Sequence, residues 1–198
     1  MRASARARNL LGVSSTRRRR SREGLTLLEA AVLFAIVGGV LAAFLHTFFR
    51  EIRTSKTAEA VSHLELLHQR TAAYFAAEHR AEDGSIVRRC LPESAGPAPE
   101  APSKKPAEVS FYDVAIPGYT TFLVLGFQPD AVRFRYSLVS HREGCGLEHL
   151  GKGPDVEFIA EGDLDGDGTF STFVRGAMID EAGELVPYGP LRVKDRTE

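Results

Sequence analysis

Glu29 is the side chain whose presence is hardest to explain by its surroundings. It is the only charged residue in the run from Leu25 to Phe49, where His46 is the only other strongly polar side chain. A carboxylate inside an apolar span is unfavourable and is usually kept for a function. The run contains no Lys or Arg. Its positive partner must therefore be an upstream arginine, a lipid head group or an α-amino group created by cleavage just before the run.

A second acidic group consists of Asp163, Asp165 and Asp167, which belong to the sequence DLDGDGTFS. This order resembles the first nine positions of EF-hand and dockerin calcium loops, where the three carboxylates and the carbonyl of Thr169 would supply oxygen ligands. The twelfth position, however, is Val174 instead of an acid. Asp and Gly are also the residues that β-hairpin turns require. The sequence favours a turn without metal, with bound calcium as the alternative, and we expect no other cofactor.

The two cysteines, Cys90 and Cys145, both follow the apolar run. If that part of the chain lies outside the cytoplasm, the oxidising compartment and the even cysteine count favour a disulfide between them. Such a bond would close a loop of about 55 residues and stabilise the fold by about 4 kcal/mol on the chain-entropy model. Two separate buried thiols are the alternative.

Charge is distributed unevenly along the chain. Residues 1–24 hold eight arginines and one acid, whereas residues 25–198 hold 17 basic and 25 acidic side chains. This acidic remainder disfavours nucleic-acid binding by the mature domain. The arginines could form a nucleic-acid-binding tail in isolation, but they directly precede an apolar run, where the positive-inside rule accounts for them better. The run is long enough to cross a hydrocarbon core of about 30 Å as a helix.

One long helix over residues 25–80 should carry Glu29, with residues 25–49 in a membrane. No proline or glycine lies between Val40 and Arg80. The second half has apolar residues at helical spacing, which predicts one face packed on a globular body. That face comprises Ile52, Val61, Leu64, Leu67 or His68, Thr71 and Phe75, and the solvated remainder is marked by Glu51, Lys56, Glu59, Glu65 and Arg70.

The rest of the chain predicts a loop followed by an antiparallel sheet. Residues 81–108 form the loop, whose segment 92–106 contains five prolines and can form neither a helix nor a central strand. Residues 109–198 form the β domain. Its strand-like runs are 109–116, 121–127, 132–139, 156–160, 169–174 and 185–193. In the third run Phe134, Tyr136 and Leu138 alternate with Arg133, Arg135 and Ser137, as in a half-buried strand. The predicted fold class is α+β.

Residues 22–29, REGLTLLE, resemble the type IV prepilin processing site, in which a basic leader ends in Gly before an apolar residue, Thr, two apolar residues and Glu. The resemblance implies a pilin-like ladle, removal of the leader 1–24, and a filament core formed by residues 25–49 after assembly. A membrane prepilin peptidase would cut between Gly24 and Leu25 and methylate the amine of Leu25. Glu29 would then pair with the N-terminal amine of a neighbouring subunit and set the register of assembly.

This resemblance implies a structural subunit of a type IV pilus or of a secretion-type pseudopilus, without enzymatic activity. Its partners would be copies of itself or of related subunits, the prepilin peptidase, the inner-membrane assembly platform and membrane lipid. It would begin as a single-pass inner-membrane protein with a periplasmic β domain. The alternative is an uncleaved signal-anchored protein whose β domain binds calcium or another ligand, with an acid that is incidental near the cytoplasmic end of the span.

Overall fold

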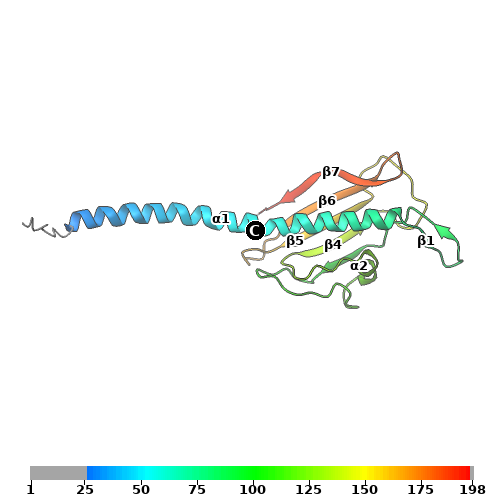
Figure 1. Ribbon diagram of the computed structural model, residues 1–198, viewed down its shortest axis with the longest axis horizontal. Helices are drawn as coiled ribbons and strands as arrows, with labels where there is room; N and C mark the ends of the chain where they lie inside the picture. The colour runs from blue at the N-terminus through cyan, green and yellow to red at the C-terminus, as the bar shows by residue number, and fades with distance from the viewer. Residues whose placement is uncertain (1–25, 197–198) are drawn as a thin grey trace, which may run out of the picture. The chain divides into compact units, whose positions relative to one another are not determined.

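The computed structural model describes residues 26–196, apart from the side chains of residues 46, 47 and 49–55. The fold is α+β (Figure 1). Its helices are α1 (Leu27–Ala76) and α2 (Tyr119–Leu125), and its strands are β1 (His79–Arg80), β2 (Ile86–Val87), β3 (Ala95–Ala98), β4 (Arg135–Ser140), β5 (Val156–Gly162), β6 (Ser171–Ile179) and β7 (Leu185–Lys194). The chain divides into two units, residues 1–45 and 46–198.

An antiparallel sheet with the order β3-β4-β5-β6-β7 forms most of the second unit, and β1 and β2 form a separate small hairpin. The antiparallel sheet expected from the sequence is therefore confirmed. Both outer strands contain proline: Pro97 in β3, and Pro187 and Pro190 in β7. Because proline has no N–H group to donate to a neighbouring strand, it is tolerated at sheet edges and limits further pairing there.

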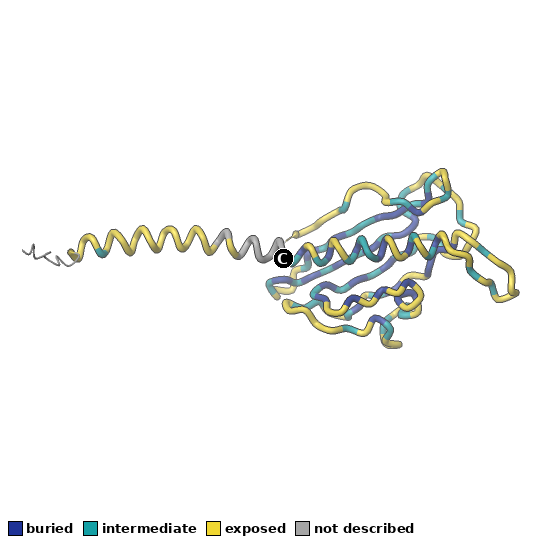
Figure 2. The backbone as a smooth tube through the Cα atoms, in the orientation of Figure 1, coloured by how far each residue is buried: buried dark blue, intermediate teal, exposed yellow. Residues whose placement is uncertain are grey.

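The core of this unit lies between the sheet and the second half of α1 (Figure 2). Leu64, Leu67 and Phe75 from the helix are at most 1 % exposed. They belong to one buried cluster with Phe158 of β5 and Phe173 of β6. The alternation predicted for residues 132–139 is also observed, since the side chains at 132, 134, 136 and 138 are all buried. Burial of these apolar side chains is the main force that fixes the helix on the sheet.

Two details of the predicted helix are wrong. Val61 is exposed, and Ala60 occupies the buried position beside it. The helix also ends at Ala76, before residue 80. There the ring Nε2 of His79 donates to the carbonyl of Tyr74 at 2.7 Å, and β1 begins at the same histidine. Because the last carbonyls of a helix lack partners within the helix, this contact helps to end α1.

The prediction of a strand over residues 121–127 is wrong, because this run falls largely within α2. Thr121, Phe122 and Leu125 are its buried residues, a spacing that fits a helix turn. Gly118 and Gly126 bracket the helix with φ values of 64° and 63°, in the left-handed region that favours glycine. A β-carbon at Gly118 would also lie 2.4 Å from the carbonyl oxygen of Ser94. The β-branched and aromatic residues of this run had favoured a strand by composition alone.

The run 109–116 is also not a strand. At its start the backbone pairs with the side chain of Gln128, whose Oε1 accepts the Phe111 N–H at 3.1 Å and whose Nε2 donates to the Val109 carbonyl at 2.9 Å. A side-chain amide thus replaces a neighbouring strand. The proline-rich segment, expected as a loop, contributes the edge strand β3. The β1-β2 hairpin begins at the last two residues of the predicted helix, and only β2 lies within the loop predicted over 81–108. The predicted exclusion of a central strand from 92–106 is confirmed.

Candidate functional site

The start of α1 contains Thr26 and Glu29, the described part of the predicted processing motif. The Thr26 N–H and the Thr26 hydroxyl both donate to Glu29 Oε2, at 2.9 and 2.8 Å. The Glu29 N–H reaches Thr26 Oγ1 at 3.3 Å. Gly24 and Leu25, the predicted cleavage and methylation positions, lie outside the described residues. The carboxylate therefore sits beside the backbone that directly follows the predicted cleavage point.

This reciprocal arrangement is a capping box, the helix-start motif with Ser or Thr at the cap and Glu or Gln three residues later. Its sequence signal is the pattern T-x-x-E at residues 26–29. It gives Glu29 a local role that needs neither processing nor a second subunit. The two roles make different demands on the side chain: a cap requires an acceptor oxygen, whereas pairing with an amine requires a negative charge.

The helix segment Leu27–Leu45 presents apolar side chains that no other described residue covers. It is 19 residues long with a mean hydropathy of 2.4, and none of its most apolar window is buried. Leu27, Leu28 and Phe34 are 90 %, 75 % and 78 % exposed. Such a large apolar surface is unfavourable in water and marks a membrane or protein contact. The segment is long and apolar enough to cross a membrane.

The three aspartates of the second motif meet in the connection between β5 and β6. One carboxylate oxygen from each of Asp163, Asp165 and Asp167 lies within 4.8 Å of the others. These side chains also organise the loop: Asp163 accepts the N–H groups of Gly166 and Gly168, and Asp167 accepts the Thr169 N–H at 2.7 Å. Gly162 and Ser171 pair directly across the base, so the predicted hairpin connection is confirmed.

The surroundings of this loop favour a turn over a calcium site. Val174, which stands where the last ligand of a calcium loop belongs, is paired within the sheet to Ile159 and Arg192. In addition, a β-carbon at Gly166 would lie 2.4 Å from Lys104 Nζ, so a cationic side chain already lies against the turn. An ammonium group there partly neutralises the acidic loop and opposes binding of a second cation.

We expect Asp163→Ala to lower the free energy of unfolding by about 1–2 kcal/mol, because two backbone N–H groups lose their acceptor. Asp163→Asn should have an intermediate effect, because its one side-chain oxygen can replace only one of the two carboxylate oxygens that accept from Gly166 and Gly168. Thermal melting of both variants, with and without ~1 mM Ca²⁺, measures this. The wild-type melting temperature should not respond to the ion. A rise with Ca²⁺ that disappears in the Asn variant would instead establish a calcium site.

The disulfide joins Cys90, which follows β2, to Cys145 in the β4-β5 connection. Backbone hydrogen bonds hold both sides of the crosslink: the Leu91 N–H donates to the Gly144 carbonyl at 3.1 Å, and the Gly146 N–H to the Arg88 carbonyl at 2.9 Å. The crosslink closes a separation of 55 residues. It therefore restricts the unfolded chain as well as fixing this loop against the segment after α1.

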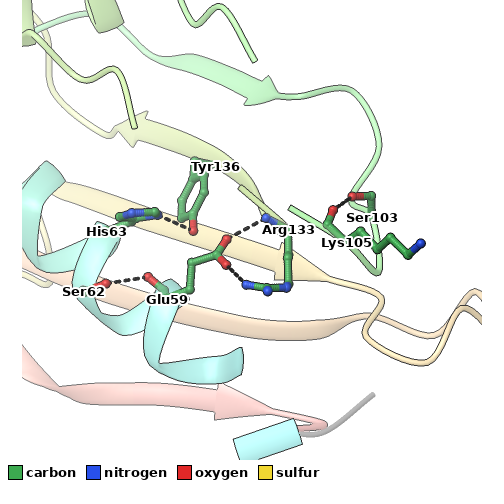
Figure 3. A network of polar contacts seen from close by, with 7 residues as sticks. All are labelled: Glu59, Ser62, His63, Ser103, Lys105, Arg133 and Tyr136. Carbon is green, nitrogen blue, oxygen red and sulfur yellow. Dashed lines mark hydrogen bonds and ion pairs between the residues drawn. The ribbon is translucent and has the colours of Figure 1, made fainter. Parts of the chain in front are cut away.

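Charged and polar contacts also join α1 to the sheet (Figure 3). Glu59, expected to be solvated, accepts the N–H and Nη1 of Arg133, both at 2.6 Å. One turn later His63 Nδ1 lies 2.8 Å from the Tyr136 hydroxyl. Burial, reinforced by Glu59, raises the pKa of Tyr136, while burial lowers the pKa of His63 against the opposing effect of Glu59. These contacts fix the position of the helix on the sheet.

Comparisons with protein-family models, with curated proteins and with solved structures found no match to this chain.

Proposed function

We propose that this chain is a type IV pilin-like subunit that is processed after Gly24 and assembled through its N-terminal helix. The exposed apolar segment Leu27–Leu45 carries the proposal. It begins within the REGLTLLE motif, shortly after the arginine-rich leader. The same α1 continues into an amphipathic half that packs on an antiparallel sheet, as in the ladle expected for a pilin-like fold.

In this proposal the apolar segment has two successive environments. It first anchors the chain in the inner membrane, where the arginines of the leader favour a cytoplasmic N-terminus and a periplasmic β domain. After the peptidase removes residues 1–24, the assembly platform moves the subunit into a pilus or a secretion pseudopilus. Neighbouring helices then replace lipid around the same side chains. Both environments cover a surface that is unfavourable in water.

The alternative is an uncleaved, signal-anchored protein. The capping box favours it, because the contacts between Thr26 and Glu29 supply a reason for the acid without processing. The two proposals predict different N-termini for the protein isolated from its native membrane. N-terminal sequencing that finds methylated Leu25 supports the pilin-like subunit, whereas an intact arginine leader supports the anchored protein.

Gly24→Ala, or a larger residue at this position, should leave most of the protein with its leader attached, because the peptidase must accommodate the chain closely at the bond it cuts. Mass spectrometry of the membrane-extracted protein measures the fraction processed. Gly12→Ala is a matched control within the leader and should be processed normally. A mature N-terminus at Leu25 in the Gly24 variants would contradict this mechanism.

A further inference from the structure

His68 is a buried histidine on α1 that the proposed function does not use. It is 7 % exposed, and neither ring nitrogen has a hydrogen-bond partner among the residues that the structure describes. Buried polar groups in folded proteins nearly always have a partner, so such an exception calls for an explanation. A neutral imidazole can remain in this position at moderate cost, whereas a charged one cannot.

Groups from three elements surround the ring. Phe158 of β5 contacts it edge to face, with centroids 6.0 Å apart. Glu65 of α1 lies one turn earlier, with Oε1 4.0 Å from Nδ1. That carboxylate already binds Arg175 of β6, whose Nη2 is 2.7 Å from Glu65 Oε2. Gln69 donates to the same Glu65 Oε1 at 3.2 Å. The nearest acid is thus engaged by a cation and an amide.

We propose that His68 is an acid-sensitive latch that holds the second half of α1 on the sheet while its ring is neutral. Protonation would place a second positive charge beside Arg175 in a poorly solvated interface between helix and sheet. Glu65 offsets that charge only in part, because its carboxylate already pairs with Arg175. Loosening of the helix from β5 and β6 would relieve the repulsion and return the imidazolium to water.

The direction of the pH effect follows from the pKa. Burial lowers the pKa of His68, Arg175 lowers it further, and Glu65 opposes them. The unfolded chain, with an ordinary histidine pKa of about 6.5, therefore binds the proton more readily than the folded chain. The stability that a neutral His68 contributes is fully present above that pH. It is lost as the pH falls from about 6.5 toward the lowered pKa of the folded chain. His63 should act in the same direction, since burial lowers its pKa too.

The test uses the full-length chain in detergent micelles, with the disulfide intact, and compares melting temperatures between pH 8 and pH 5. We expect the wild type to lose roughly 3 °C or more relative to His68→Leu, which cannot take up the proton. At pH 8 the melting temperature of the leucine variant should equal or exceed that of the wild type. His68→Gln, a neutral polar side chain of similar size, provides a second comparison if leucine disturbs the packing.

Two further variants locate the effect. His141→Gln removes a partly exposed histidine whose Nε2 lies 3.3 Å from Glu157, and it should retain the acid sensitivity of the wild type. His63→Phe measures the parallel contribution of the other buried ring. Hydrogen exchange, corrected for intrinsic rates, should show faster exchange of amides in residues 60–72 at pH 5 in the wild type but not in the His68 variants.

Three outcomes would overturn the latch. The wild type could melt at the same temperature throughout the pH range. The leucine and glutamine variants could keep its full acid sensitivity. The melting temperature could rise on acidification, which would mean that the imidazolium gains an ion pair with Glu65. Each result is independent of whether the leader is cleaved, because the latch lies wholly in the second unit.

Discussion

Asp155→Ala is expected to lower the free energy of unfolding by about 3 kcal/mol, because the buried Ile179 N–H loses its acceptor and the Arg142 guanidinium loses its carboxylate partner. Asp155 is 6 % exposed. Its Oδ2 accepts the Ile179 N–H at 2.7 Å, and its Oδ1 lies 2.8 Å from Nη1 of Arg142. The carboxylate thereby joins the β4-β5 connection to the end of β6. For a chain of this size the loss corresponds to roughly 6–12 °C in melting temperature.

Two matched variants separate the parts of this effect in the full-length chain. Asp155→Asn retains an oxygen for the Ile179 N–H but loses the charge. Its free energy of unfolding should therefore lie between those of the wild type and the alanine variant. Asp195→Asn removes the charge of an exposed aspartate that lies 3.9 Å from Lys194, and it should change stability by less than about 0.5 kcal/mol. Asparagine is the control here because the φ of residue 195 is 49°, where alanine is strained. Equal effects of asparagine at positions 155 and 195 would show that the buried pair does not stabilise the fold.

The parts of the fold that follow from local spacing could be predicted from the sequence. The alternation of Phe134, Tyr136 and Leu138 predicted one buried strand face, and the helical spacing of Leu64 and Phe75 predicted the face of α1 that packs on the sheet. Both patterns are observed. In each case the period of the apolar residues determines which side is buried, whatever the partner is. The alternation of Asp and Gly at residues 163–168 similarly predicted the loop between two strands.

The partners themselves could not be predicted. Glu59 was expected in solvent because it is a charged residue outside the apolar stripe, yet it binds Arg133 at a sequence separation of 74 residues. The pair of Glu65 and Arg175 was missed for the same reason. Nothing in local composition says which distant strand will lie under a given helix turn. Gln128 is a similar case, since its amide replaces a strand partner for residues 109–111 and so removes the predicted strand.

In the candidate site, too, the residue could be predicted from the sequence but its contacts could not. The type and position of Glu29 made it a candidate functional residue from the sequence, but its hydrogen bonds with Thr26 appear only in the structure. Those contacts create two explanations for one side chain: a cap for α1, or a charge kept for a neighbouring subunit. The distinction matters because only the second explanation requires assembly.

Glu29→Gln separates these explanations. If Glu29 pairs with a neighbouring subunit as proposed, this variant should reduce the number of filaments by more than roughly tenfold, because it would remove one charge of that buried intermolecular pair. Glutamine still accepts the hydrogen bonds of a capping box, so the start of α1 should remain intact. Electron microscopy of sheared filaments measures assembly. Immunoblotting of the membrane fraction should show normal amounts of protein, and N-terminal sequencing should show normal removal of the leader.

Thr26→Ala is the complementary variant, since it removes the hydroxyl of the cap and leaves the carboxylate charged. If the charge of Glu29 pairs with the amine of a neighbour, this variant should assemble far better than Glu29→Gln. If Glu29 only caps the helix, the order reverses: glutamine assembles like the wild type and Thr26→Ala becomes the weaker variant. The first order supports a register set between subunits by opposite charges in an apolar helix bundle, where an unpaired carboxylate is strongly unfavourable.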